Sequence, residues 1–185
     1  MVLIGANFER FADTSKTASK QNYSYLCRCL ISLIMAKVKR IMVHCTGEPA
    51  NVVRRKSYYV WLFFKEYHWK HFGYHRVIYQ DGSWSDLQPI PAGLKGFGII
   101  SDSTMANGCK GANLDSLHVA YVGGLDPLTR VDKDTRTEPQ KAALLQTIKE
   151  WKQLFGISEV IGHRDWPCVK KSCPCFDARK EYANV

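Results

Sequence analysis

The sequence lacks several features that would assign it to a common functional class. Its seven cysteines are an odd number, which argues against a closed disulfide framework. It has no zinc-finger pair, no basic region with heptads and no aromatic RNA-binding signature. It shows no internal repeats, and nothing resembling a linker follows residue 35. The 185 residues therefore indicate a single domain, large enough to fold around its own core without disulfides.

The N-terminal region does not predict a membrane span. Residues 26–36 (LCRCLISLIMA) are apolar, but the run is too short to cross a bilayer and Arg28 interrupts it. A cleaved signal peptide would also need a basic start, and the first nine residues contain no lysine or arginine. We therefore expect no membrane span and synthesis in the cytoplasm, with a secreted or periplasmic protein as the alternative.

The charge balance favours an anionic partner. The net charge is +9 and the pI is about 9.2, so nucleic acid, a membrane surface or an anionic cell wall would be attracted. The basic residues are scattered, apart from residues 54–56 and 170–171. A solvated basic surface explains this pattern as well as a nucleic-acid site does, and we expect no nucleic-acid partner.

The pattern of apolar residues predicts an α/β domain. Short apolar or β-branched runs bounded by turn residues predict strands at residues 41–45, 74–80, 83–87, 118–122 and 159–163. Residues 51–70 and 138–155 are predicted helices. Because strands alternate with helices, we expect a single domain with a central mixed β-sheet flanked by helices.

The two predicted helices differ in how well their ends are marked. Thr137 can cap the second helix, Pro139 lies in its first turn and Gly156 ends it. Asn51 is the predicted cap of the first helix. Residues 58–64 of that helix (YYVWLFF) are apolar on every side, so we expect burial rather than an exposed binding patch. Residues 91–116 are rich in Gly, Ser and Asn and predict a long irregular segment.

Three side chains suggest a metal site near the ends of the strands. His44 and His163 each lie at the end of a predicted strand, and Cys173 follows His163 by ten residues. Two imidazoles and a thiolate suit zinc, and a catalytic zinc ion keeps a fourth position for water. Composition alone leaves rival ligands, which are His75, His118, Cys45, Cys109 and Cys175.

Five short motifs occur in the order that is typical of one family. They are IMVHCT at 41–46, FGYHRVI at 72–78, YVGG at 121–124, IGHRDW at 161–166 and KSCPCFDA at 171–178. From about Met35 to Tyr182 the chain resembles the zinc-dependent N-acetylmuramoyl-L-alanine amidases, which are related to phage lysozymes and animal peptidoglycan-recognition proteins. The resemblance implies an amidase-like fold for residues 35–185.

The resemblance also implies a role for individual residues. His44, His163 and Cys173 would be the ligands of one catalytic zinc ion. Tyr74 would lie beside the metal to activate water or orient the substrate, and Lys171 would stabilise the oxyanion of the tetrahedral intermediate. Without the resemblance, Tyr74 would be interpreted as a half-buried strand aromatic and Lys171 as a solvated loop cation.

One position departs from the family pattern. Many relatives carry a histidine just before a Cys-Lys-Gly stretch, and this chain has Gly108 there, in NGCKGAN at 107–113. The departure puts substrate contacts in question more than zinc binding, and the sequence does not say whether His118 compensates. Cys168 and Cys175 flank the proposed ligand Cys173 and either pair with each other or pack.

The implied reaction is hydrolysis of the amide between N-acetylmuramic acid and L-alanine in peptidoglycan. The implied partner is peptidoglycan or a muropeptide, the implied purpose is lysis or remodelling of the cell wall, and we expect a monomer. A peptidoglycan-binding module without catalysis is one rival, although relatives of that kind usually replace the cysteine that matches Cys173. A nucleic-acid-binding protein is a second rival, motivated by charge alone.

The start of the chain gives a first prediction. Residues 10–24 are polar, whereas Met35 begins MAKVKRIMVHC, which leads directly into a predicted strand. We therefore expect Met35 to be the natural initiator and residues 1–34 to be a dispensable extension. Intact-mass measurement of the native protein checks this, and a mature chain that retains residues before Met35 would contradict it.

Overall fold

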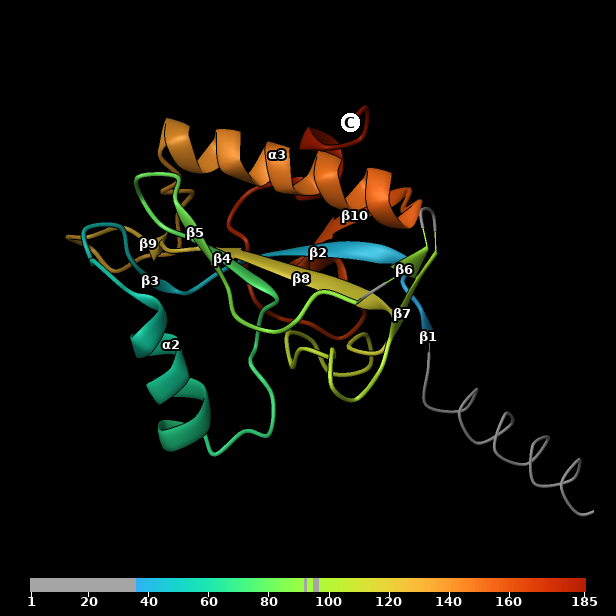
Figure 1. Ribbon diagram of the computed structural model, residues 1–185. Helices are drawn as coiled ribbons and strands as arrows, with labels where there is room; N and C mark the ends of the chain where they lie inside the picture. Colours follow the sequence, from blue (N-terminus) through green and yellow to red (C-terminus); the bar gives the residue numbers. More distant parts are fainter. Residues whose placement is uncertain (1–35, 92, 95–96) are drawn as a thin grey trace, which may run out of the picture. The chain divides into compact units, whose positions relative to one another are not determined.

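The central element is a five-stranded mixed sheet in the order β10–β2–β8–β4–β5. A computed structural model describes residues 36–91, 93–94 and 97–185 of the chain, so the predictions about residues 1–34 lie outside the described residues. The first four strands in that order run parallel and β5 is antiparallel to β4 (Figure 1). The bounds are Arg40–Cys45 for β2, Arg76–Ile78 for β4, Trp84–Asp86 for β5, Ser116–Tyr121 for β8 and Glu159–Gly162 for β10. The predicted α/β class with a mixed sheet is confirmed.

Two smaller sheets are formed by strands outside the central sheet. β1 (Ala36–Lys37), β7 (Phe97–Ile100) and β6 (Gly93–Leu94) form an antiparallel sheet, and β3 (Glu48–Pro49) pairs in parallel with β9 (Gly124–Leu125). The prediction that residues 91–116 are irregular throughout is therefore wrong for β6 and β7. A Cβ atom on Gly98 would lie 2.3 Å from Cδ1 of Phe155, so this glycine allows close packing rather than marking a loop.

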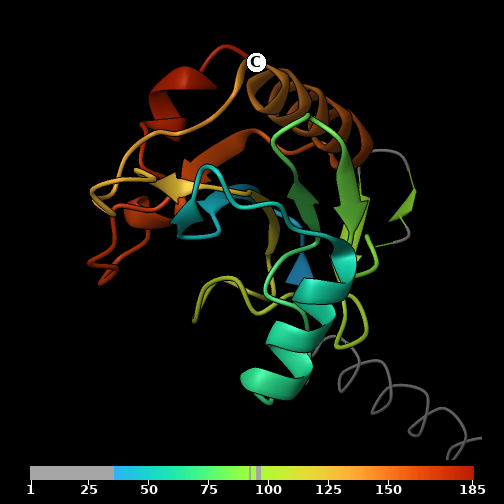
Figure 2. The same cartoon turned by 90° about the vertical axis from the view of Figure 1, so that its left-hand side faces the viewer.

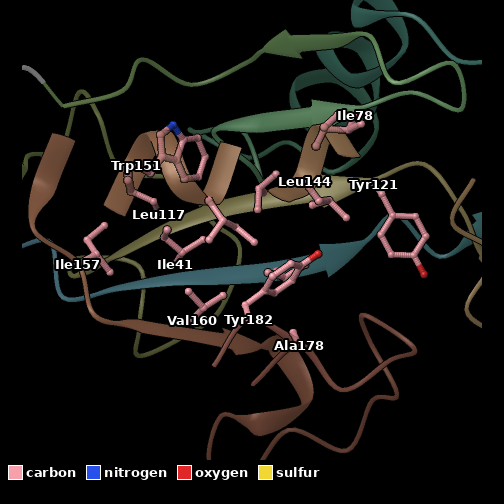
Figure 3. Packing of buried hydrophobic residues seen from close by; sticks show 14 of the residues in the cluster. Ile41, Ile78, Leu117, Tyr121, Leu144, Trp151, Ile157, Val160, Ala178 and Tyr182 are labelled. Atoms are coloured by element: carbon pink, nitrogen blue, oxygen red, sulfur yellow. The ribbon is translucent and has the colours of Figure 1, made fainter. Parts of the chain in front are cut away.

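Helix α3 (Glu138–Phe155) covers one face of the sheet and forms as predicted. Thr137 accepts a hydrogen bond from the backbone of Gln140, whose side chain accepts one from the Thr137 N–H, and Gly156 ends the helix in the left-handed conformation with φ 63°. Figure 3 shows the side chains of this helix packing against those of the strands. The fully buried side chains at the contact include Leu144, Ile148, Trp151, Ile41 and Leu117.

The predicted helix over residues 51–70 is much shorter in the structure. α2 spans Lys56–Trp61 and continues as a π-helical turn, η1 (Leu62–Glu66), and Arg55 rather than Asn51 precedes it. Residues 50–54 are held away from a helix because Gln80 donates hydrogen bonds to the carbonyls of Ala50 and Val52. These long-range contacts outweigh the local helix signal. Figures 1 and 2 show α2 on the opposite side of the sheet from α3.

The aromatic run within α2 and η1 is only partly buried. Tyr59 and Phe63 are buried and belong to a second apolar cluster with Val77. Val60 is 41% exposed and Trp61 is 49% exposed. The prediction that the whole run is buried is therefore wrong, because a helix that packs on one side leaves its other side in water.

A buried arginine, Arg136, connects the C-terminal segment to the rest of the domain. The guanidinium of Arg136 forms ion pairs with Asp134 and Glu181 and lies 3.2 Å from the ring centroid of Phe176. Glu181 belongs to the short helix α4 (Ala178–Glu181). These contacts hold both ends of the segment that follows Cys173. Within the described residues, no helix combines the length and apolarity needed to cross a membrane.

The packing of α3 predicts unequal effects of two truncations on one helix. Ile148 is fully buried, so Ile148→Ala should lower the free energy of unfolding by about 2–5 kcal/mol. Leu154 is 45% exposed, so Leu154→Ala should change it by less than about 0.5 kcal/mol. Urea titration of both variants measures this difference, and equal effects would contradict the packing described here.

Candidate metal centre

Parallel pairing brings two histidines to the same edge of the sheet. β10 pairs in parallel with β2, with Gly162 opposite Val43. His44 follows Val43 within β2, and His163 follows Gly162 as the first residue of the short 3-10 helix η2 (His163–Asp165). The centroids of the two imidazole rings are 4.7 Å apart. The two predicted ligands are therefore neighbours because of strand register.

Cys173 reaches the same point through a loop that is attached to both strands. Its carbonyl accepts a hydrogen bond of 2.7 Å from the backbone of Arg164, next to His163. Its sulfur accepts one of 3.3 Å from the backbone N–H of Cys45, next to His44. A Cβ atom on Gly162 would lie 2.6 Å from Cδ of Pro174, so glycine at this position lets the loop lie against β10.

The three side chains have the separation that a tetrahedral metal requires. One ligand atom from each of His44, His163 and Cys173 lies within 4.8 Å of the others, and Cys173 Sγ is 3.8 Å from His44 Nδ1. Nitrogen and sulfur ligands of a tetrahedral zinc ion stand roughly 3.5 Å apart, given bond lengths of about 2.0–2.3 Å. The donor set and its spacing therefore fit zinc, with room for a fourth ligand.

The rival ligands have other partners. His75 donates from Nε2 to the carbonyl of Thr104 and accepts at Nδ1 from the backbone N–H of His118. Cys109 packs in a small apolar cluster with Met42. The sulfur of Cys45 lies 3.7 Å from that of Cys175. Cys175 therefore packs against Cys45 rather than pairing with Cys168, which is exposed.

Burial keeps the two candidate histidine ligands in the neutral form that binds a metal. Burial lowers the pKa of His44 well below its usual value, and the neighbouring His118 adds to the effect. Burial, followed by the charge of Lys171, lowers the pKa of His163. Both imidazoles are therefore neutral at pH 7 with a lone pair available to a metal. Hydrogen bonding with Cys173 raises the pKa of Cys45 to about 12, so Cys45 remains a neutral thiol.

The candidate ligands open into a cleft of about 770 Å³ that also contains the other two predicted site residues. The ring centroid of Tyr74 lies 5.3 Å from that of His44, and burial raises its pKa well above the usual value, so the phenol is neutral. Lys171 is exposed at the cleft and supplies a cation there. The structure thus brings all five predicted residues to one cavity.

The aromatic part of the cleft lining was not predicted. It is formed by aromatic residues of α2, η1 and the following turn, of which Tyr67 is 48% exposed and Trp69 is 37% exposed. The apolar run at 58–64 was the sequence signal for part of this lining, but the expectation of burial did not predict exposure at a cleft. Tyr58 and Leu62 also line this part of the cleft.

A buried histidine that sequence reasoning left unassigned contacts one candidate ligand. Nδ1 of His118 lies 3.0 Å from Nε2 of His44, at hydrogen-bond distance. The two residues lie on adjacent strands, with Met42 opposite His118 and His44 opposite Ala120. Since residues two apart in a strand face the same way, His44 and His118 share a face of the sheet. The alternation of side chains along residues 116–121 predicts which residues share a face with His118. It does not predict the contact with His44 unless the register between the two strands is known.

Comparison with known proteins agrees with this arrangement. A family model described as N-acetylmuramoyl-L-alanine amidase matches residues 35–176. The endolysin of Enterobacteria phage K11 is 27% identical over 145 residues, which cover 78% of this chain and 85% of the endolysin. The solved structure of N-acetylmuramoyl-L-alanine amidase LysC from Clostridium intestinale URNW is similar, with a TM-score of 0.58 and 17% identity over 79% of this chain and 82% of that one. Drosophila PGRP-LB gives a TM-score of 0.57 and 15% identity over 80% of each chain. At these identities the solved structures establish the fold.

The buried histidines predict a loss of stability in mild acid. Burial lowers the pKa of His75 to about 4, whereas an unfolded chain titrates near 6.5. Between these values the unfolded state takes up a proton that the folded state does not, so acidification lowers the free energy of unfolding by up to about 1.4 kcal/mol per pH unit. In metal-free protein, His75→Asn should make the decline from pH 6.5 to 4 shallower. Identical slopes in urea titrations of both proteins would show that His75 does not carry this effect.

Proposed function

The chain belongs to the N-acetylmuramoyl-L-alanine amidase family, and we propose that it carries out the family's reaction with zinc held by His44, His163 and Cys173. The reaction is hydrolysis of the amide between N-acetylmuramic acid and L-alanine in peptidoglycan, and it serves lysis of the cell wall. The observation that carries the zinc proposal is the convergence of two imidazoles and one thiol within 4.8 Å in the lining of the cleft.

The chemistry of the donors supports a catalytic rather than a purely structural metal. Three protein ligands leave one tetrahedral position open, as in other hydrolytic zinc sites. A zinc ion bound there supplies Lewis acidity, which polarises an amide carbonyl and acidifies a water molecule. A zinc ion held there would be accessible to a substrate, because all three proposed ligands line the same cavity.

Tyr74 and Lys171 are proposed to assist at the reacting amide. Tyr74 carries a neutral phenol beside His44, so its hydroxyl can orient water or the substrate carbonyl through a hydrogen bond. Lys171 places a positive charge at the same cleft, where negative charge develops on the carbonyl oxygen during attack. Both would act by holding or stabilising groups at the amide.

The remainder of the cleft and the charge of the chain fit a cell-wall polymer. The exposed rings of Tyr67 and Trp69 offer flat apolar surface along the wall of the cavity. The net charge of +9 favours association with an anionic wall. We further propose that residues 35–185 are the catalytic domain, that it acts as a monomer, and that it is made in the cytoplasm before it reaches the wall.

Digestion of purified peptidoglycan tests the proposed function. We expect the protein to release stem peptides that begin with L-alanine, detected by mass spectrometry, and to stop doing so when a chelator removes zinc. Added zinc should restore release. Stoichiometric zinc without any cleavage would favour the rival reading of a binding module, with Gly108 as the departure to investigate.

Variants separate metal binding from catalysis in the same assay. Cys173→Ser should lose zinc and activity together, because a hydroxyl is a much poorer zinc ligand than a thiolate. Tyr74→Phe and Lys171→Met should keep zinc, and Lys171→Met should lower kcat by about 10²–10³ if it removes a transition-state contact. Lys180→Met, an exposed charge on α4, is the control for loss of net charge and should have little effect.

A further inference from the structure

His118 makes a contact with a proposed ligand that no assigned role explains. Its Nδ1 lies 3.0 Å from His44 Nε2, and both residues are buried, with at most 1% of their surface exposed. A ligand histidine commonly uses its second nitrogen to hydrogen-bond a neighbouring group, which fixes the orientation and tautomer of the ring. In this chain that neighbour is another imidazole.

The direction of the hydrogen bond follows from the geometry of His44. Its Nδ1 faces the sulfur of Cys173, at 3.8 Å, so Nδ1 is the atom available to a metal. Nε2 then carries the hydrogen and donates it to His118 Nδ1. A neutral His118 then accepts this hydrogen bond at Nδ1 and carries its own hydrogen on Nε2.

The second ring nitrogen of His118, Nε2, is buried and makes no hydrogen bond among the described residues. Buried polar atoms without a partner are rare, so the presence of a histidine here calls for an explanation, and the contact of its Nδ1 with His44 offers one. The backbone N–H of His118 is satisfied separately by Nδ1 of His75, at 2.9 Å. Among the described residues, the ring of His118 therefore makes its hydrogen bond to His44.

Gly108 provides the space that the His118 ring occupies. A Cβ atom on Gly108 would lie 2.3 Å from Nδ1 of His118 and 2.5 Å from its Cγ. These ring atoms are fixed between β8 and His44, so they could not move away without breaking the hydrogen bond. Position 108 also lines the cleft. Glycine at 108 and histidine at 118 are therefore mutually dependent.

We propose that His118 is a positioning residue that fixes the tautomer and orientation of His44 for zinc, and that Gly108 is glycine because it admits the His118 ring. This inference rests on the proposed zinc site. It also explains the departure at Gly108, since an imidazole on the sheet now occupies the space beside that loop position. His118 touches neither the cleft's substrate face nor the metal in this role, because its contact is with His44.

Zinc affinity of the full chain, measured by competition with a chromophoric chelator, tests the proposal. His118→Leu keeps a similar volume but removes the acceptor, and we expect zinc affinity to fall about 10–100-fold. His118→Asn, whose Oδ1 can stand near the position of Nδ1, should recover most of that loss. The urea midpoint of each metal-free protein is measured alongside, since a purely structural role would lower stability without separating the two variants in affinity.

A matched control comes from the neighbouring imidazole. His75 is equally buried and stacks on His118 with centroids 5.9 Å apart, but it contacts no proposed ligand. His75→Leu should therefore destabilise the metal-free protein and leave zinc affinity within about threefold of the original. Equal losses of affinity in His75→Leu and His118→Leu would overturn the proposal.

A double-mutant cycle tests the dependence between positions 108 and 118. Gly108→Ala should weaken zinc binding when His118 is present and have little effect in the His118→Ala background, because the ring it displaces is gone. Equal effects in both backgrounds would overturn the steric part of the proposal. If the unaltered chain bound no zinc, the proposed metal site itself would fail; if it bound zinc tightly and every His118 variant did too, only this inference would fail.

Discussion

The parallel pairing of β2 with its two neighbours fixes the geometry of the site. β10 on one side aligns His163 with His44, and β8 on the other side aligns His118 with it. A slip of one residue in either pairing would turn the side chains of that strand to the opposite face. Such a slip would also turn the apolar side chains that pack on α3 toward the buried histidines, and the histidines toward α3. The burial that stabilises the domain therefore also enforces the alignment of the imidazoles.

The two faces of the sheet differ in polarity. One face is filled by the apolar side chains under α3 (Figure 3). The other contains His44, His75 and His118 within the interior, where charged imidazoles would be unfavourable. They remain neutral and satisfy one another in part, through the contacts between His44 and His118 and between His75 and the backbone of His118. A polar row inside a domain is tolerated because its members are each other's partners.

Local sequence signals predicted two elements correctly. α3 follows from its capping residues and helical periodicity, and β2 follows from a short apolar run between turn residues. α2 was predicted too long because Gln80, far along the chain, holds residues 50–52 away from a helix. The candidate ligands could be nominated from the order of motifs, but their proximity depends on strand register. His118 could not be distinguished from His75 without that register. The exposed aromatic residues of the cleft were missed because their apolar character predicted burial.

The proposed ligands lie far apart in the chain, which affects how the metal site would assemble during folding and synthesis. His44 and Cys173 are separated by 129 residues, yet their side chains meet. A metal joining them would act as a cross-link that closes almost the whole domain into a loop, and the entropy removed from the unfolded chain grows with the length of that loop. The same separation governs synthesis, because a nascent chain has the first ligand long before the last. The three proposed ligands could therefore come together only after residue 173 had left the ribosome.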